Sequence, residues 1–91
     1  MTNLKQLPKD YLDQIENGEL DWMDLCRCYA LSESFISEYA DKVHWFLISA
    51  HQSLSENFIR DFADKVDWYW ISQCQILSDE FTIEMQLKGY L

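Results

Sequence analysis

Leu31-Ser32-Glu33-Ser34-Phe35-Ile36 recurs as Leu54-Ser55-Glu56-Asn57-Phe58-Ile59 and, in weaker form, as Leu77-Ser78-Asp79-Glu80-Phe81-Thr82. Each copy begins 23 residues after the one before it. The stretch Ala40-Asp41-Lys42-Val43-His44-Trp45 returns at the same offset over residues 63–68. A fixed period in this range is typical of stacked repeats, in which each unit buries its apolar face against its neighbours. Such proteins usually present a surface, so we expect binding rather than catalysis.

Each repeat predicts two helices. Ser32, Ser55 and Ser78 stand where a serine hydroxyl can accept a hydrogen bond from the free amides of a helical first turn. The Phe and Ile that follow each serine supply the apolar face of that first helix. Asp41 and Asp64 are then expected to cap a second helix carrying Trp45 or Trp68, and each helix should have roughly two to three turns.

The ends of the chain fit the same scheme in diverged form. Residues 7–30 align as a first unit if one extra residue falls at the Asn17-Gly18 turn, which keeps Trp22 in register with Trp45. Residues 77–91 supply one helix with a stop signal at Lys88-Gly89. The prediction is a single all-α domain over residues 1–91, a short α-solenoid of about three and a half two-helix repeats. Its units are 7–30, 31–53, 54–76 and the C-terminal half-unit 77–91.

Composition narrows the functional classes. Sixteen acidic against seven basic residues give a formal charge of −9, which argues against direct binding to nucleic acid or to an anionic membrane. Such a charge favours a partner with a basic surface, or serves solubility alone. Three cysteines, no secretory leader and no apolar run of membrane-spanning length indicate a reduced, cytoplasmic protein.

Comparing the copies separates expected interior positions from surface positions. Positions filled alike are expected to be buried, as with Trp22/Trp45/Trp68 and Leu25/Ile48/Ile71. Positions filled differently are expected at the surface, as with Asp21/His44/Asp67 and Asp24/Leu47/Trp70. Trp70 stands out because a carboxylate and a leucine occupy its equivalents. It is either an exposed anchor for a partner or a side chain packed on the C-terminal cap.

One repeat position holds Cys28, His51 and Cys74, which first suggests zinc or cysteine–histidine catalysis. Zinc needs its ligands within about 4 Å of one another. Stacked helices stand roughly 8–10 Å apart, so ordinary stacking would keep these three side chains separate. The chain also has only two glycines and no phosphate-binding loop. We therefore expect no metal, no cofactor and no enzymatic activity.

The acidic residues remain as a candidate functional feature. Carboxylates on successive units can form rows that imitate a nucleic-acid backbone and occupy a basic channel, although a solvated acidic face explains them equally well. The residues we select as partner contacts are Asp10, Asp13, Asp21, Asp24, Asp67 and Trp70.

The pattern Leu-Ser-Glu-x-Phe-Ile, Asp-Lys-Val-x-Trp and Ile-Ser over residues 31–82 resembles 23-residue tandem repeats of phage and giant-virus proteins. The resemblance implies a phage-like origin, and with it similarity in kind to phage inhibitors of bacterial defence such as anti-CRISPR proteins. The function expected first is therefore an inhibitor in the host cytoplasm that covers the basic, nucleic-acid-binding surface of a defence effector. The alternative is a scaffolding module that binds a protein, or itself, through an apolar face around Leu47, Tyr69 and Trp70.

Overall fold

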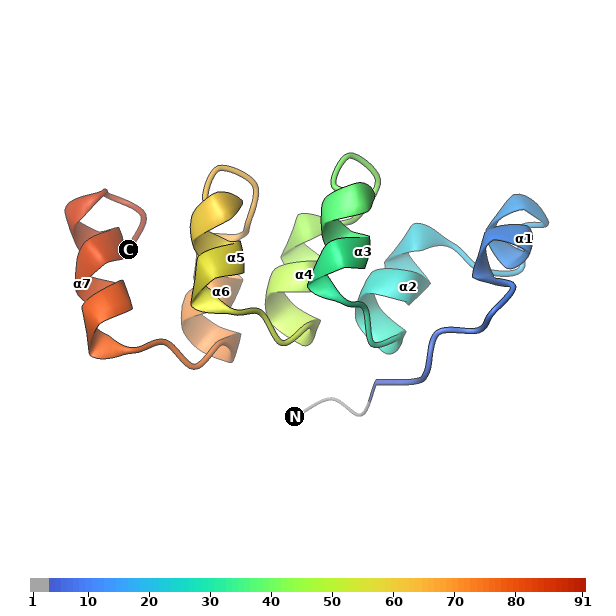
Figure 1. Cartoon of the computed structure of the whole chain (residues 1–91), viewed down its shortest axis with the longest axis horizontal. Helices are drawn as coiled ribbons and strands as arrows, with labels where there is room; N and C mark the ends of the chain where they lie inside the picture. Colours follow the sequence, from blue (N-terminus) through green and yellow to red (C-terminus); the bar gives the residue numbers. More distant parts are fainter. Residues whose placement is uncertain (1–3) are drawn as a thin grey trace.

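A computed structural model describes residues 4–91, which form seven short helices (Figure 1). Their bounds are α1 Tyr11–Glu16, α2 Trp22–Cys28, α3 Glu33–Glu38, α4 Trp45–His51, α5 Glu56–Asp61, α6 Trp68–Cys74 and α7 Asp79–Leu87. Within this described part, extended pairing is limited to one isolated bridge between Lys5 and Tyr29. The prediction of an all-α fold is confirmed.

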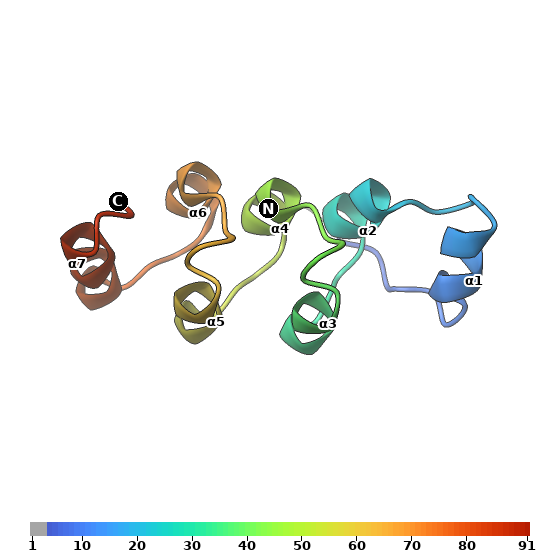
Figure 2. The same ribbon diagram turned by 90° about the horizontal axis from the view of Figure 1, so that it is seen from above.

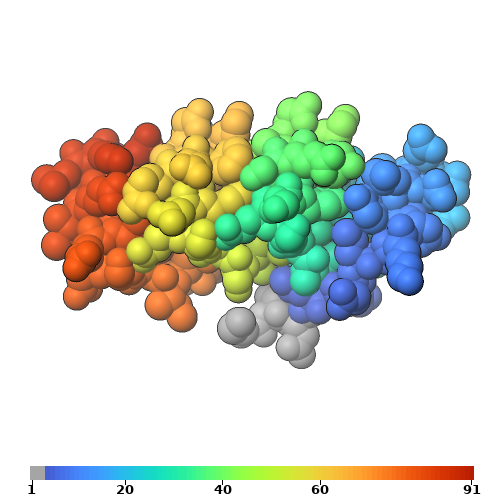
Figure 3. All heavy atoms as spheres, viewed as in Figure 1, coloured from blue at the N-terminus to red at the C-terminus, as the bar shows by residue number. Residues whose placement is uncertain are grey.

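The helices succeed one another along the longest of three axes of 45, 25 and 18 Å. Seen from above, α2, α4 and α6 form one row, and α3 and α5 lie beside them in another (Figure 2). The central helix α4 packs against both α2 and α6. Side chains fill the spaces between successive units along the axis (Figure 3).

The helices α3, α5 and α7 begin as their serines predict. In all three copies the serine hydroxyl accepts a hydrogen bond from the backbone N–H of the phenylalanine three residues later. The pairs are Ser32 with Phe35, Ser55 with Phe58 and Ser78 with Phe81, at 3.1, 3.1 and 3.2 Å. This bond satisfies one of the amides that a helical first turn leaves without a partner.

The start predicted for the second helix is wrong. Asp41 lies in a turn, because the backbone N–H groups of Lys42 and Val43 both bond to the Tyr39 carbonyl and continue the first helix by one turn. The same holds for Asp64. The N-caps are instead three residues later, at Asp21, His44 and Asp67. The second helices have seven residues each, about two turns, which is at the lower end of the predicted length.

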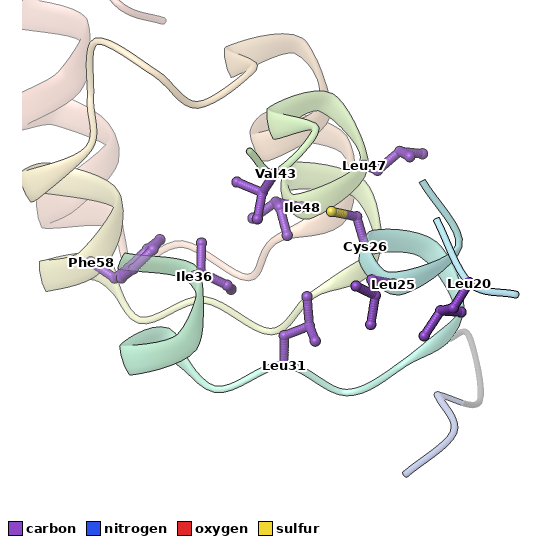
Figure 4. Packing of buried hydrophobic residues seen from close by; sticks show 9 residues of the cluster. All are labelled: Leu20, Leu25, Cys26, Leu31, Ile36, Val43, Leu47, Ile48 and Phe58. Carbon is purple, nitrogen blue, oxygen red and sulfur yellow. The ribbon is translucent and has the colours of Figure 1, made fainter. Parts of the chain in front are cut away.

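The core confirms much of the comparison between copies. Leu25, Ile48 and Ile71 are fully buried, and the cluster around Leu25 and Ile48 is shown in Figure 4. Trp22, Trp45 and Trp68 are half-buried. The prediction that Leu47 lies at the surface is wrong, because α4 is flanked on both sides and Leu47 is only 7% exposed.

A glutamine at the end of α4 and of α6 joins consecutive units. The Gln52 amide accepts a hydrogen bond from the Leu31 N–H at 3.0 Å and donates to the carbonyls of Cys26 and Tyr29 at 3.0 and 2.8 Å. Gln75 repeats the arrangement 23 residues later, with Leu54 at 3.2 Å, Ser49 at 2.9 Å and Gln52 at 2.7 Å. We call these two sets the glutamine bridges.

Two further contacts repeat with the same offset. The Glu33 carboxylate accepts hydrogen bonds from both the backbone N–H and the hydroxyl of Ser55, at 2.6 and 3.0 Å, and Glu56 does the same for Ser78. At the second helices, the His44 N–H donates to the Cys26 sulfur and the Asp67 N–H to the Ser49 hydroxyl. The 23-residue period of the sequence is therefore also the period of the hydrogen bonds between units.

The C-terminal end has contacts of its own. Gly89 takes a left-handed conformation, with φ of +87°, and the Tyr90 N–H returns to the Met85 carbonyl, so the predicted helix stop is confirmed. The Tyr90 ring then stacks on Trp68, with 4.8 Å between ring centroids. This stacking covers part of the Trp68 ring, as Phe58 and Phe62 cover the ring of the equivalent Trp45.

Candidate binding surface

An apolar row runs along the outer side of the second helices. Met23, Phe46 and Tyr69 occupy one repeat position on α2, α4 and α6, and they are 42, 43 and 64% exposed. Because α4 packs on both neighbours, equivalent positions on the three helices lie next to one another. We call Met23, Phe46, Tyr69 and the adjacent Trp70 the apolar row.

Helical geometry explains why these side chains face solvent. Trp45, Ile48 and Ser49 follow at spacings of three and four residues and share the buried face of α4. Phe46 is displaced from Trp45 by roughly 100° around the helix axis, outside that face. The sequence analysis placed Tyr69 and Trp70 in a candidate apolar face but did not extend that face to Met23 and Phe46. The spacing within each helix was the signal that could have separated them from the buried residues.

Trp70 forms the C-terminal end of the row. Its side chain is 38% exposed and meets Tyr69 edge to face, with 5.1 Å between ring centroids. The equivalent Leu47 is only 7% exposed and belongs to the same core cluster as Leu25 and Cys26 of α2. The two neighbouring exposed rings, Tyr69 and Trp70, therefore lie on α6, the last of the second helices in the described part of the chain.

Three of the predicted contact carboxylates lie beside the row but have structural partners. Asp21 accepts a hydrogen bond from the Asp24 N–H at 2.8 Å, and Asp67 accepts from the N–H groups of Tyr69 and Trp70 at 3.1 and 3.4 Å. Asp24 pairs with Arg27 at 2.9 Å. Asp21 and Asp67 therefore cap α2 and α6, in addition to any contact that they make with a partner.

The other two predicted carboxylates lie on the first helix. Asp10 is the N-cap residue of α1 without a side-chain cap bond, and its carboxylate accepts from the Gln14 amide at 2.9 Å. Asp13 is exposed in the first turn of α1. The structure therefore divides the predicted contact residues between α1 and the ends of α2 and α6.

The three cysteines differ in their surroundings. Burial raises the pKa of the Cys26 thiol, an effect only partly opposed by the hydrogen bond from the His44 N–H, so this thiol stays protonated. Cys28 is half-buried and Cys74 is exposed. Across residues 4–91, no three His, Cys, Asp or Glu side chains are grouped so that they could hold a metal ion.

Comparison with protein-family models, curated proteins and solved structures gives no match to this chain. None of the helices in the described part is long and apolar enough to cross a membrane. The candidate site therefore rests on its own geometry.

Proposed function

We propose that this chain is a non-enzymatic binding protein, built as a short α-solenoid, that binds a protein partner through the apolar row. The observation that carries the proposal is the exposure of large apolar side chains at one repeat position on three neighbouring helices. Exposed apolar groups that lie together mark interaction sites more often than single exposed residues do. Aromatic side chains also supply much of the binding energy of protein interfaces.

The dimensions suit a protein partner. One broad side of the molecule measures 45 by 25 Å, which exceeds the roughly 800 Å² that each partner buries in an interface of standard size. Tyr69 and Trp70, at one end of the row, have the geometry of rigid anchors because they already contact each other. Rigid side chains lose little conformational entropy when a partner covers them.

Charge indicates what surrounds the apolar contact on the partner. The chain carries −9, and the carboxylates of Asp21, Asp24 and Asp67 flank the row. A partner with basic groups around an apolar centre would match this arrangement. A second copy of the chain would place like charges together, so self-association through the row is the less favoured outcome.

A second candidate function is inhibition of a bacterial defence effector of the CRISPR-Cas kind, with the protein acting in the host cytoplasm as a nucleic-acid mimic. The observation that favours it is the acidic N-terminal region. Asp13, Glu16 and Glu19 are exposed on and after α1. The ion pairs within residues 4–91 involve other carboxylates: they join Asp24 to Arg27, and Glu84 to Arg60 and Lys88. Such a surface would bind chiefly by electrostatic attraction, which salt screens.

A salt-graded capture experiment separates the two functions. Tagged protein is incubated with nuclease-treated bacterial lysate, and bound proteins are eluted with rising salt. Three forms are compared: wild type, Phe46→Ser/Tyr69→Ser, and Asp13→Asn/Glu16→Gln/Glu19→Gln. We expect a partner that stays bound to the wild type at high salt. The Phe46→Ser/Tyr69→Ser variant should fail to capture it, and the variant with the three acidic residues replaced should capture it as wild type does. A partner eluted at moderate salt and lost with the second variant would reject the row and support the mimic.

A further inference from the structure

The N-terminal segment shows how an extended chain binds this fold. Lys5 lies parallel to the linker between α2 and α3, where its N–H donates to the Cys28 carbonyl at 2.7 Å. Its own carbonyl accepts from the Ala30 N–H at 2.8 Å. In Figure 1 this segment runs along the lower edge of the molecule, where the linkers after α2, α4 and α6 also lie.

The linker after α6 has the same backbone shape as the linker that Lys5 covers. Gln75 has φ and ψ of −100° and 144°, against −118° and 141° for Tyr29 in the equivalent position of the first unit. Both values are those of an extended strand. The glutamine bridge of Gln75 holds this linker in place through its bonds to Ser49 and Gln52.

In the first unit, Lys5 pairs with backbone groups of the linker after α2. The equivalent backbone groups of the linker after α6 have no such partner among residues 4–91. Among residues 4–91, no hydrogen bond reaches the Cys74 carbonyl or the Ile76 N–H, which correspond to the groups of Cys28 and Ala30. The Ile76 side chain is 100% exposed. An unpaired backbone edge of this kind can accept a further strand.

A cavity of about 730 Å³ adjoins this edge. Its lining includes Cys74, Gln75 and Ile76 from the last linker, Ser53 and Leu54 from the linker after α4, and Leu4 of the N-terminal segment. This volume lies in the range of roughly 300–1,000 Å³ that is usual for ligand-binding clefts. Apolar side chains and an open backbone edge therefore border the same space.

We propose that the linker at residues 74–76 binds an extended, basic segment of a partner protein, which adds in parallel register as Lys5 does at Tyr29. The chain's own segment, Leu4-Lys5-Gln6-Leu7, supplies the pattern of an occupant: a basic and a polar residue between two leucines. A basic segment also complements the charge of −9. Backbone hydrogen bonds give affinity in this mode of recognition, and side-chain contacts give selectivity.

The occupant is a partner segment rather than the chain's own N-terminus. Lys5 is already paired with the first linker, so residues 4–6 do not serve both linkers at once. A second copy would have to release its Lys5 from Cys28 and Ala30 before it could pair, and would lose two hydrogen bonds. The linker begins at Cys74, about one helical turn after Trp70 on α6, but it uses backbone groups that the apolar row does not, so variants of the row leave them in place and the two proposals are tested separately.

The test uses the whole protein, labelled with ¹⁵N, and a synthetic peptide of residues 1–9 as the probe. We expect saturable shifts of the amide signals of Cys74, Gln75 and Ile76. Ile76→Pro removes the N–H donor and should weaken binding about tenfold, whereas Ile76→Val keeps the donor and should bind as wild type does. The proline is compatible with the fold because the ψ of Gln75 suits a residue that precedes proline.

A second probe keeps the test independent of the folding of the variant. A peptide methylated at the backbone nitrogen of its lysine cannot donate to the Cys74 carbonyl and should bind the wild type about tenfold more weakly. The absence of saturable shifts at residues 74–76, or equal binding by Ile76→Pro and Ile76→Val, would overturn the proposal. Shifts that grow with protein concentration alone, with formation of a dimer, would identify a second copy as the occupant and reject the partner segment.

Discussion

The two glutamine bridges make the same hydrogen bonds in different surroundings. Gln52, between α2 and α4, is 3% exposed, and the N-terminal segment pairs with the linker that it holds. Gln75, between α4 and α6, is half-buried, and no segment among residues 4–91 pairs with its own linker at residues 74–76. The repeat thus fixes which groups bond, whereas the neighbouring segments decide how far water can replace those bonds. The junction between α2 and α4, at Gln52, should therefore be more stable than the junction between α4 and α6, at Gln75.

The largest expected effect comes from removing each bridge in turn. Gln52→Ala leaves the Leu31 N–H and two carbonyls without partners in a buried place, and should lower the free energy of unfolding by about 3 kcal/mol. Gln75→Ala should cost about 1 kcal/mol, because water reaches the same groups there. Urea unfolding followed by circular dichroism measures both. Equal losses would show that burial does not distinguish the junctions.

The contacts of Glu33 with Ser55 and of Glu56 with Ser78 allow a comparison of how easily an inner helix and the terminal helix α7 unfold locally. Glu56→Ala removes both hydrogen bonds that the carboxylate accepts from Ser78, and should cost about 1 kcal/mol. Because α7 ends the array, the loss should appear as faster hydrogen exchange in α7, with α4 unchanged. Glu33→Ala removes the same contact inside the array and serves as the matched variant. Exchange that accelerates equally in α4 and α7 for Glu56→Ala would contradict local opening.

The aromatic contact at the C-terminal end should have a smaller effect. Tyr90→Ala removes the ring stacked on Trp68 and should lower the free energy of unfolding by about 1 kcal/mol, with a change in tryptophan fluorescence. Tyr69→Ala is the control, because that ring is 64% exposed and should alter stability by less than about 0.5 kcal/mol. A larger loss for Tyr69→Ala would mean that the apolar row holds the fold together.

The smallest effect depends on pH and concerns the link between α5 and α7. Arg60 first, and then Lys88, lower the pKa of the Glu84 carboxyl from 4.5 to about 2. A carboxyl whose pKa is lower in the folded state stabilises the protein above its unfolded pKa and loses that contribution as the pH falls. Glu84→Gln should therefore reduce the dependence of stability on pH between about 4.5 and 2. Acid unfolding curves that coincide for the variant and wild type would contradict this link.

The sequence predicted the parts of the fold that repeat. The period of 23 residues, the serine caps and the buried Leu25, Ile48 and Ile71 could all be read by comparing copies. The glutamines at 52 and 75 and the glutamates at 33 and 56 were also alike in the copies. Their roles were not predicted, because hydrogen bonds between units depend on how the helices stack in space.

The errors arose where neighbours rather than the local sequence decide the outcome. Leu47 is buried because α4 is flanked on both sides, although its position varies between copies. Asp41 and Asp64 resemble helix caps, but the preceding helix continues through a further turn and moves the cap to His44 and Asp67. Phe46 is apolar in sequence and exposed in the structure, and it was not included in the predicted apolar face.

The affinity of a purified, captured partner for the wild type and for Phe46→Ser/Tyr69→Ser tests the central claim most directly. Calorimetric titration would give both affinities, and urea unfolding would report the stability of each form. The account predicts that the variant binds at least about 30-fold more weakly while its free energy of unfolding stays within about 0.5 kcal/mol of wild type. Equal affinities for the two forms would contradict the assignment of binding to the apolar row.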